Sequence, residues 1–368
     1  MRIHPTASAH RLALGTAVFV LLLAGARSAG QLGNGSRFAS RIAELSEPGG
    51  YFDTDNLISN EKSYLHVIPA LRQGAVTGGA YIGVGPDQNF SYIARVRPSI
   101  AFIVDVRRDN LLLHLLFKAL FSMAGTRAEY LSLLFGRAPP PRLDEWRAAT
   151  VERLAGHIDG TPAAPGTTVE LDGRVRATLA TFGVPLSRDD VATIQLFHHR
   201  FIDAGLPLKF ESKGRPSRSY YPTYRELLLE TDRQGHQWNY LASEEDYQFV
   251  RSLQRRDLII PVVGNLSGQS ALAAIGRLMT ERGDRLSAFY TSNVEFYLFG
   301  DGTFPRFVEN LTRVPRTNRS VIIRSVFGGF TPIDAAPGYY SASMLQSVDD
   351  LVTGFSGGKY RAYHELAR

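Results

Sequence analysis

The sequence predicts an α/β protein with three layers: a doubly wound, mostly parallel sheet, helices on both of its faces, and a long helical insertion. Short, nearly continuous apolar runs alternate with helical patterns over residues 80–124, and this alternation resumes at residue 257. Strands that are apolar on both faces and separated by helices are typical of a covered parallel sheet. We therefore expect a sheet of about six or seven strands. The sheet belongs to one domain over residues 80–368, which the insertion at residues 125–256 interrupts.

The first 26 residues have the composition of a secretory signal peptide. Arg2 and Arg11 precede an apolar run over residues 12–26, and residues 1–26 contain no acid. The small residues Ala24 and Ala26 suit cleavage. A helix over this run is about 22 Å long at ~1.5 Å per residue, shorter than a hydrocarbon core of about 30 Å. We expect an exported protein, periplasmic or secreted. The alternative is an inner-membrane anchor formed by residues 12–26.

Charge and cysteine content exclude several classes of partner. Removal of residues 1–26 lowers Lys+Arg from 41 to 39 against 35 acids, a formal charge of +4. That excess is too small to predict a nucleic-acid partner. No cysteine and no His-Glu-x-x-His pattern is present, so neither a disulfide nor a metal site is expected. We expect a small-molecule ligand, and no stable membrane partner beyond the N-terminal segment.

After a polar segment over residues 27–79, strands and helices are expected in a regular order. The first block comprises a strand at 80–85 (AYIGVG), a helix at 89–96 (NFSYIARV), a strand at 99–106 (SIAFIVDV) and a helix at 110–125 (NLLLHLLFKALFSMAG). The second block comprises a strand at 257–264 (DLIIPVVG), a helix at 270–283 (SALAAIGRLMTERG), a strand with a turn at 286–299 (LSAFYTSNVEFYLF) and a strand at 320–329 (SVIIRSVFGG).

The stretch between the two blocks is expected to be a mostly helical cap. It holds proline-rich linkers and helical patterns around residues 143–158 and 187–204. Ser243, followed by acids at 244–246, predicts a helix N-terminus, because a serine cap and acidic first turn complement the helix dipole. In the helix at 110–125, His114, Lys118 and Ser122 recur every four residues, which predicts a buried helix with one edge in water.

The glycine turn YIGVGPD is the strongest candidate for a ligand loop. Gly83 and Gly85 allow a tight turn and a close backbone approach, and the following helix offers free N–H groups. Asp87 disfavours a pyrophosphate but suits a nucleoside that carries amino or hydroxyl donors. Asp105, near the end of the next strand, is placed to accept hydrogen bonds from ribose hydroxyls. The alternative is a structural turn, with Asp105 capping the next helix.

Over residues 80–124 and 257–330, the sequence resembles the class I S-adenosylmethionine-dependent methyltransferases. It also resembles an uncharacterised bacterial protein family related to these enzymes. YIGVGPD is similar to their first motif, and Asp105 matches their ribose-binding acid. The resemblance implies a Rossmann-like fold and S-adenosylmethionine as cofactor. The sequence departs from the pattern at Asp87, where glycine is usual, and at Asn265, where an acid is common.

The same resemblance implies further residues of the site. VVGNLSG looks like the third-strand motif, which places Asn265 near the adenine, and FYTSNVEFYL looks like the fourth-strand segment beside the methyl donor. By that likeness Ser292, Asn293 and Glu295 line the site. In the N-terminal segment, Asn56, Asn60 and Glu61 precede the first strand, where related folds pass the chain across the ligand, so they are possible pocket residues. No catalytic signature is present, and the catalytic residues stay unassigned.

Two classes of function follow from these observations. The first is methyl transfer from S-adenosylmethionine to an unknown acceptor, which depends on alignment of the reacting atoms more than on acid–base groups. The second is an exported, non-catalytic binding protein whose pocket holds a nucleoside-like or polar ligand. A hydrolase that reuses the pocket is a minor third option. GFSGG at residues 354–358 does not support it, because no acid and histidine follow in the required order.

Overall fold

The computed structural model of the protein describes residues 35, 37–54, 56–212, 216, 218–330 and 335–367. The expected signal segment, residues 1–26, lies outside these ranges. Within them, no helix combines the length and the apolar composition that a membrane crossing requires.

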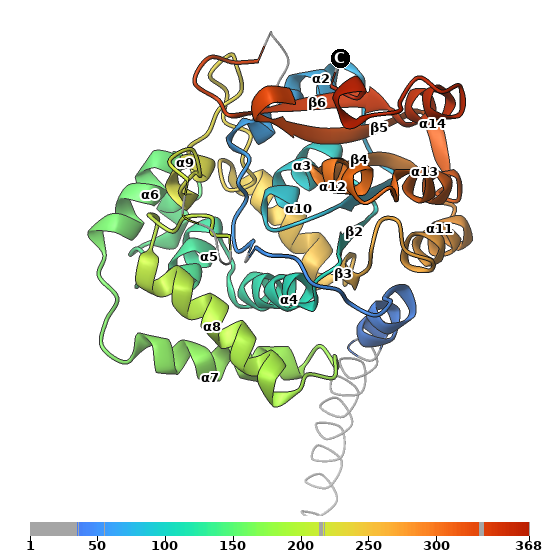
Figure 1. The fold of residues 1–368 in the computed structure, drawn as a ribbon. Coiled ribbons are helices and arrows are strands. Elements are labelled where there is room, and N and C mark those ends of the chain that lie inside the picture. Colours follow the sequence, from blue (N-terminus) through green and yellow to red (C-terminus); the bar gives the residue numbers. More distant parts are fainter. Residues whose placement is uncertain are drawn as a thin grey trace, which may run out of the picture.

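A six-stranded sheet with the order β3-β2-β1-β4-β5-β6 forms the centre of the molecule (Figure 1). β1 to β5 are parallel, and β6 is antiparallel to β5. The chain moves outward from β1 to β3 and then returns to β4 on the other side of β1. The strand order therefore reverses between β1 and β4. The strands are β1 (Ala80–Gly83), β2 (Ile100–Asp105), β3 (Ile259–Val263), β4 (Leu286–Ser292), β5 (Arg316–Phe327) and β6 (Ser341–Ser347).

Two groups of helices cover the sheet. Right-handed crossovers place the helices between β1 and β3 on one face and those between β3 and β5 on the other. On the first face α3 (Gln88–Val96) and α4 (Arg108–Met123) both contact α10 (Glu244–Arg255). On the second face α13 (Phe304–Thr312) contacts both α11 (Ala271–Arg282) and α14 (Val348–Ser356). The predicted mixed α/β class with a mostly parallel sheet is confirmed.

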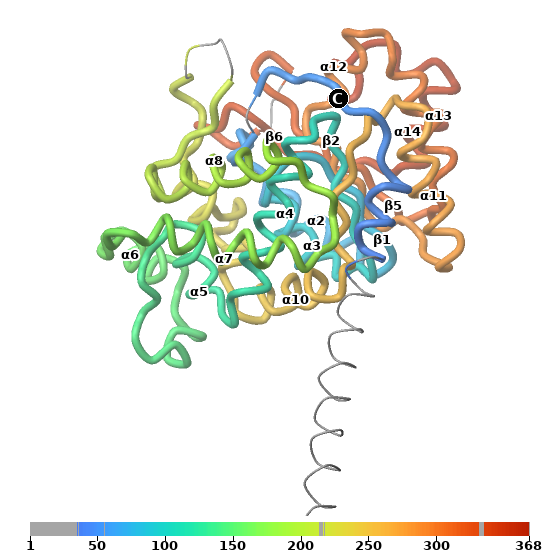
Figure 2. The backbone as a smooth tube through the Cα atoms, turned by 90° about the horizontal axis from the view of Figure 1, so that it is seen from below, coloured from blue at the N-terminus to red at the C-terminus, as the bar shows by residue number. Residues whose placement is uncertain are grey.

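Helices dominate the segment between residues 125 and 256, as expected, and they lie to one side of the sheet (Figure 2). α10 belongs to the layer on the sheet, and its N-terminus is capped as predicted: Ser243 Oγ accepts a hydrogen bond from the Asp246 N–H at 3.1 Å. The other helices are α5 (Arg127–Leu134), η2 (Leu143–Trp146), α6 (Val151–Gly160), α7 (Thr167–Ala180), α8 (Arg188–Ala204) and α9 (Tyr224–Leu228).

The insertion corrects one expectation about α4. Two of the three polar residues on the edge that was predicted to touch water are buried, whereas the third, Ser122, is exposed as predicted. His114 is only 2% exposed, and its Nε2 donates to the Gly85 carbonyl at 2.9 Å. Lys118, 3% exposed, forms an ion pair with Asp257 at 2.7 Å. The helical period identified the polar stripe correctly, but protein covers it at His114 and Lys118 and leaves only Ser122 in water.

The C-terminal part contains elements that the sequence pattern did not predict. The expected strand at 286–299 is β4 followed at once by α12 (Val294–Gly300), and β6, α13 and α14 were not expected. Before the sheet, residues 37–45 are helical, and η1 (Lys62–Val67) runs into α2 (Ile68–Gln73). η1 packs against β6, so the N-terminal segment reaches the far edge of the sheet. Two short 3-10 turns, η3 (Gly328–Phe330) and η4 (Tyr363–Glu365), complete the described part.

Candidate functional site

A cavity of about 280 Å³ lies at the carboxyl edge of the sheet, where the strand order reverses. Ligands of open α/β sheets bind at this position. The structure brings together here the four segments that were expected to meet. They are residues 84–86 after β1, residues 105–107 at the end of β2, residues 264–266 after β3 and residues 292–294 at the end of β4.

The N-terminal segment forms the opposite wall, together with aromatic side chains. Phe52 and Tyr297 pack edge to face with ring centroids 4.9 Å apart. Tyr51, 78% exposed, stands at the rim, and Phe210 and Tyr221 join the lining from the insertion. Flat rings beside a polar floor suit a planar heteroaromatic ligand, because aromatic faces stack favourably. The volume is at the lower end of the range of about 300–1,000 Å³ for ligand pockets, which suits a nucleoside better than a dinucleotide.

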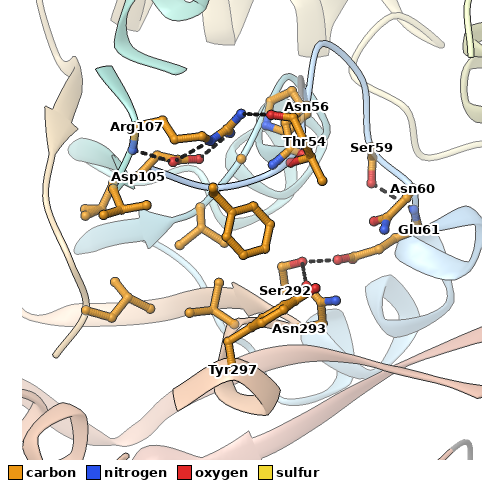
Figure 3. A pocket seen from close by; sticks show the side chains of 18 of the residues that line it. Thr54, Asn56, Ser59, Asn60, Glu61, Asp105, Arg107, Ser292, Asn293 and Tyr297 are labelled. Carbon is orange, nitrogen blue, oxygen red and sulfur yellow. Dashed lines mark hydrogen bonds and ion pairs between the residues drawn. The ribbon is translucent and has the colours of Figure 1, made fainter. Parts of the chain in front are cut away.

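Asp105 and Arg107 form one polar end of the pocket (Figure 3). Asp105 Oδ1 accepts from the Arg107 backbone N–H at 2.9 Å and from Nε at 3.1 Å, and Oδ2 accepts from Nη2 at 2.8 Å. Arg107 Nη1 also donates to the Thr54 carbonyl at 2.8 Å. A carboxylate offers about four acceptor positions. Three are used here, so one position on Oδ2 remains for a ligand hydroxyl. The backbone N–H that Asp105 accepts from, that of Arg107, lies just before α4. This contact agrees with the alternative that Asp105 caps the next helix.

Glu61 forms the second polar end, across the pocket from Asp105 (Figure 3). Its side chain is buried and accepts hydrogen bonds from three hydroxyls: Tyr290 at 2.6 Å, Ser292 and Ser325. Burial raises the pKa of Glu61, while the three hydroxyl donors act in the opposite direction. Ser292 adopts φ = +54°, a left-handed conformation that is costly for a residue with a Cβ. Backbone strain of this kind is concentrated at functional sites.

The remaining expected residues of the lining lie between these two ends. Asn56 Oδ1 accepts from Thr54 Oγ1 at 2.9 Å, and Asn265 Oδ1 accepts from the Ser267 N–H and hydroxyl, both at 2.9 Å. Asn60 lines the cavity next to Glu61. Asn293 Oδ1 lies 3.4 Å from Ser292 Oγ.

Three of the expected site residues do not line the cavity, and the first is Gly83. A Cβ at this position would overlap the amide oxygen of Asn89 and approach the Tyr81 ring to 2.8 Å. Asn89 in turn holds the turn together, since its amide donates to the carbonyls of Val84 and Pro86. Gly83 therefore permits α3 to begin directly under the strand, and Gly85, at φ = +81°, is the glycine of the turn that faces the pocket.

Asp87 points away from the cavity, into the junction between the sheet and the insertion. Its carboxylate accepts from Tyr224 at 3.0 Å and from Tyr240 at 3.4 Å. Burial raises the pKa of Asp87 to about 6. Glu295 is also away from the cavity: it is completely buried and forms a two-point ion pair with Arg324, at 2.5 and 3.1 Å. Asp87 and Glu295 were expected to line the ligand site, but each of them contacts protein side chains instead.

Sequence reasoning missed several lining residues. Gln88 lines the cavity and donates from Nε2 to the Tyr290 hydroxyl at 3.0 Å. An arginine two residues after Asp105 was the available indication of an ion pair there. Phe52 and Tyr297 had no such indication, because nothing in the local pattern brings residue 52 next to residue 297. In the described part of the chain, no three histidine, aspartate or glutamate side chains are grouped to hold a metal ion.

A family model described as a domain of unknown function (DUF7790) matches residues 56–138 and 209–365, well over half of the chain. No curated protein matches. The matched ranges contain both polar ends of the pocket. They leave out residues 139–208, which carry η2, α6, α7 and α8.

Proposed function

The chain belongs to the family of the domain of unknown function DUF7790, and we propose that this member binds a nucleoside-type ligand, with S-adenosylmethionine as the first candidate, and transfers its methyl group to an unknown acceptor. The observation that carries the proposal is the position and lining of the pocket. It lies where the strand order reverses, an acid ends β2, and aromatic rings form one wall. Sites at this position in doubly wound sheets hold nucleotides in other proteins.

Asp105 is the residue that receives the ribose in this proposal. Arg107 holds its carboxylate in one orientation, with Oδ1 fully used and one acceptor position left on Oδ2. A side chain fixed in this way loses little conformational entropy when a ligand binds, which favours affinity. Asn265 and Leu266, after β3, lie on the same side of the pocket as possible neighbours of the base. Methyl transfer at such a site requires alignment of nucleophile, methyl carbon and sulfur, and no dedicated acid.

A second candidate is a binding protein without turnover, and one observation favours it. The Asp105 carboxylate is already neutralised by Arg107, so a ligand gains at most one hydrogen bond from it. A ligand with fewer ribose contacts, such as another nucleoside or a polar heterocycle, fits that arrangement equally well. We further propose that the protein is exported. Mass spectrometry of protein from its native host should then find a mature N-terminus between Arg27 and Gln31, whereas an intact Met1 would contradict export.

Calorimetric titration of the full-length mature protein tests the binding proposal. S-adenosylmethionine, S-adenosylhomocysteine and adenosine are the ligands, and Asp105→Asn is compared with Asp109→Asn. Asp109 lies in the first turn of α4 and outside the pocket lining, which makes it the matched control. Micromolar binding of the first two ligands, weakened only by Asp105→Asn, supports the methyltransferase proposal. Binding of adenosine alone supports the binding protein, and no binding of any of the three rejects the methyltransferase proposal and an adenosine-type ligand for the binding protein.

A further inference from the structure

The Glu61 end of the pocket contains hydrogen-bond acceptors without matching donors. Glu61 is 1% exposed, and its Oε2 accepts from both Tyr290 and Ser325, whereas Oε1 accepts from Ser292 alone. With about two acceptor positions on each oxygen, one position on Oε1 remains. Among the described residues, no lysine, arginine or histidine lies within ion-pair distance of this carboxylate. A buried carboxylate usually has a cationic partner.

Gln88 presents a second acceptor in the same cavity. The single proton of the Tyr290 hydroxyl is given to Glu61, so the tyrosine oxygen must accept from the Gln88 amide. This fixes the orientation of the amide, with Nε2 toward Tyr290 and Oε1 away from it. Gln88 is 7% exposed, and its Oε1 has no hydrogen-bond donor in the described structure. A buried acceptor of this kind costs about 1–3 kcal/mol unless something donates to it.

We propose that this end of the pocket binds an amine, in its cationic ammonium form, with Oε1 of Glu61 and Oε1 of Gln88 as the acceptors. An ammonium carries several N–H donors and a positive charge, so one group satisfies both oxygens and neutralises the carboxylate. A hydroxyl has a single proton and would leave one acceptor unmatched. An anion would be repelled. The inference rests on the proposed function, because it assumes that the nucleoside part of the ligand occupies the Asp105 end.

The ammonium has two possible sources with the same chemistry. It is either the amino group on the tail of the nucleoside ligand itself or the amine of a second, separate molecule. Burial raises the pKa of Glu61, and an ammonium beside it would offset the cost of the buried charge. A purely structural Glu61, which only ties the N-terminal segment to β4 and β5, would affect stability and would not distinguish an amine from its amine-free counterpart.

The test measures, on the full-length mature protein, whether an amine binds more tightly than its amine-free counterpart. S-adenosylhomocysteine, which has an ammonium, is compared with its des-amino analogue, which keeps the carboxylate of the tail and lacks only the ammonium. Putrescine is compared with 1,4-butanediol on protein saturated with 5′-methylthioadenosine. Glu61→Gln removes the charge. Ser325→Ala is the matched control, because it removes a hydroxyl from the Oε2 side of the same carboxylate, and Ser325 does not line the cavity.

We expect Glu61→Gln to weaken the binding of one amine probe at least tenfold and to change the binding of its amine-free counterpart less than twofold. Ser325→Ala should preserve the preference for the amine probe. If Glu61→Gln weakens the binding of S-adenosylhomocysteine, the ammonium belongs to the tail of the nucleoside ligand. If it weakens the binding of putrescine, the ammonium belongs to a separate amine. Equal effects on amine and amine-free probes overturn the inference, as does wild-type protein that prefers neither amine. If Glu61→Gln does not fold, Gln88→Met, which removes the second acceptor, should reduce the same preference severalfold.

The proposed function and this inference can fail separately. Protein that binds 5′-methylthioadenosine but shows no preference for either amine retains the nucleoside site and loses the amine site. Protein that binds no nucleoside, yet prefers putrescine over 1,4-butanediol in the absence of any other ligand, loses the proposed function and retains an amine site at Glu61.

Discussion

The guanidinium of Arg107 lies alongside the carboxylate of Asp105, with Nε 3.1 Å from Oδ1 and Nη2 2.8 Å from Oδ2. Both side chains are largely buried, at 5% and 11% exposure. Asp105 is therefore not an exposed loop acid, because the same carboxylate that faces the pocket also neutralises a buried arginine.

Asp105→Ala is therefore expected to destabilise the fold as well as ligand binding. Removal of one member of a buried ion pair costs about 3–5 kcal/mol, because the other charge stays buried. Urea denaturation of Asp105→Ala and of Glu170→Ala makes the comparison, since Glu170 pairs with Arg174 on the surface. The surface variant should lose less than about 1 kcal/mol. Similar losses in the two variants would mean that the Asp105 pair contributes no more than an exposed one.

Ser292 provides a test of backbone strain at the pocket. Ser292→Ala and Ser292→Gly both remove the hydroxyl that donates to Glu61, but only glycine is free of a Cβ at φ = +54°. The left-handed conformation costs an L-residue about 1–2 kcal/mol. Ser292→Gly should therefore be more stable than Ser292→Ala by about 1 kcal/mol in chemical denaturation. An alanine variant as stable as the glycine variant would show that this turn relaxes.

Asp87 should make stability depend on pH. Burial raises its pKa from the ordinary value of 3.8 to about 6, so the folded state binds this proton more tightly than the unfolded chain. Its contribution is complete below about pH 4 and is lost as the pH rises through 6. Asp87→Asn does not titrate. Relative to wild type, its free energy of unfolding should rise between pH 4 and pH 7 by up to roughly 3 kcal/mol. Parallel curves for the two proteins across this range would exclude the titration.

Glu295 and Arg324 should behave as a pair inside the core. Glu295→Ala leaves a buried guanidinium without its carboxylate and is expected to cost about 3–5 kcal/mol of stability. Replacing both residues, as Glu295→Leu with Arg324→Met, should cost clearly less, because no charge is then buried. Thermal and urea denaturation of Glu295→Leu, of Arg324→Met and of the double variant form the cycle. Additive losses would show that the two groups do not interact.

The sequence pattern predicted the parallel part of the sheet because each of its strands is a short apolar run next to a helix. It also predicted that the ends of four strands meet, since parallel strands bring their carboxyl ends to one edge. Prediction was weaker after β4. The run VEFYLF is apolar enough to read as strand, yet it forms α12. β6, SASMLQS, is a half-polar edge strand whose pairing with β5 depends on distant residues.

The same difference between predictable and unpredictable parts is found in the candidate site. Residues at or just after the ends of strands, such as Gly85, Asp105 and Ser292, line the cavity as expected. Asp87 and Glu295 lie on neighbouring helices, and the sequence gives no indication of which way their side chains point. Their directions are decided by partners far along the chain, namely Tyr224 and Arg324. Such long-range partners are invisible to local periodicity.

The hydrogen bond between Glu61 and Ser325 joins residues that are 264 positions apart, and this separation imposes an order of events on biosynthesis. At about 5–20 residues per second, a ribosome needs roughly 13 to 53 s to make the intervening chain. Ser292, 231 positions after Glu61, is made late in that interval, and Ser325 is made only at its end, so for most of the time neither hydroxyl is present to donate to the carboxylate. The Asp105 and Arg107 pair, two residues apart, can form almost at once. One end of the pocket is thus available early on the nascent chain, while the other waits for the last strands to emerge.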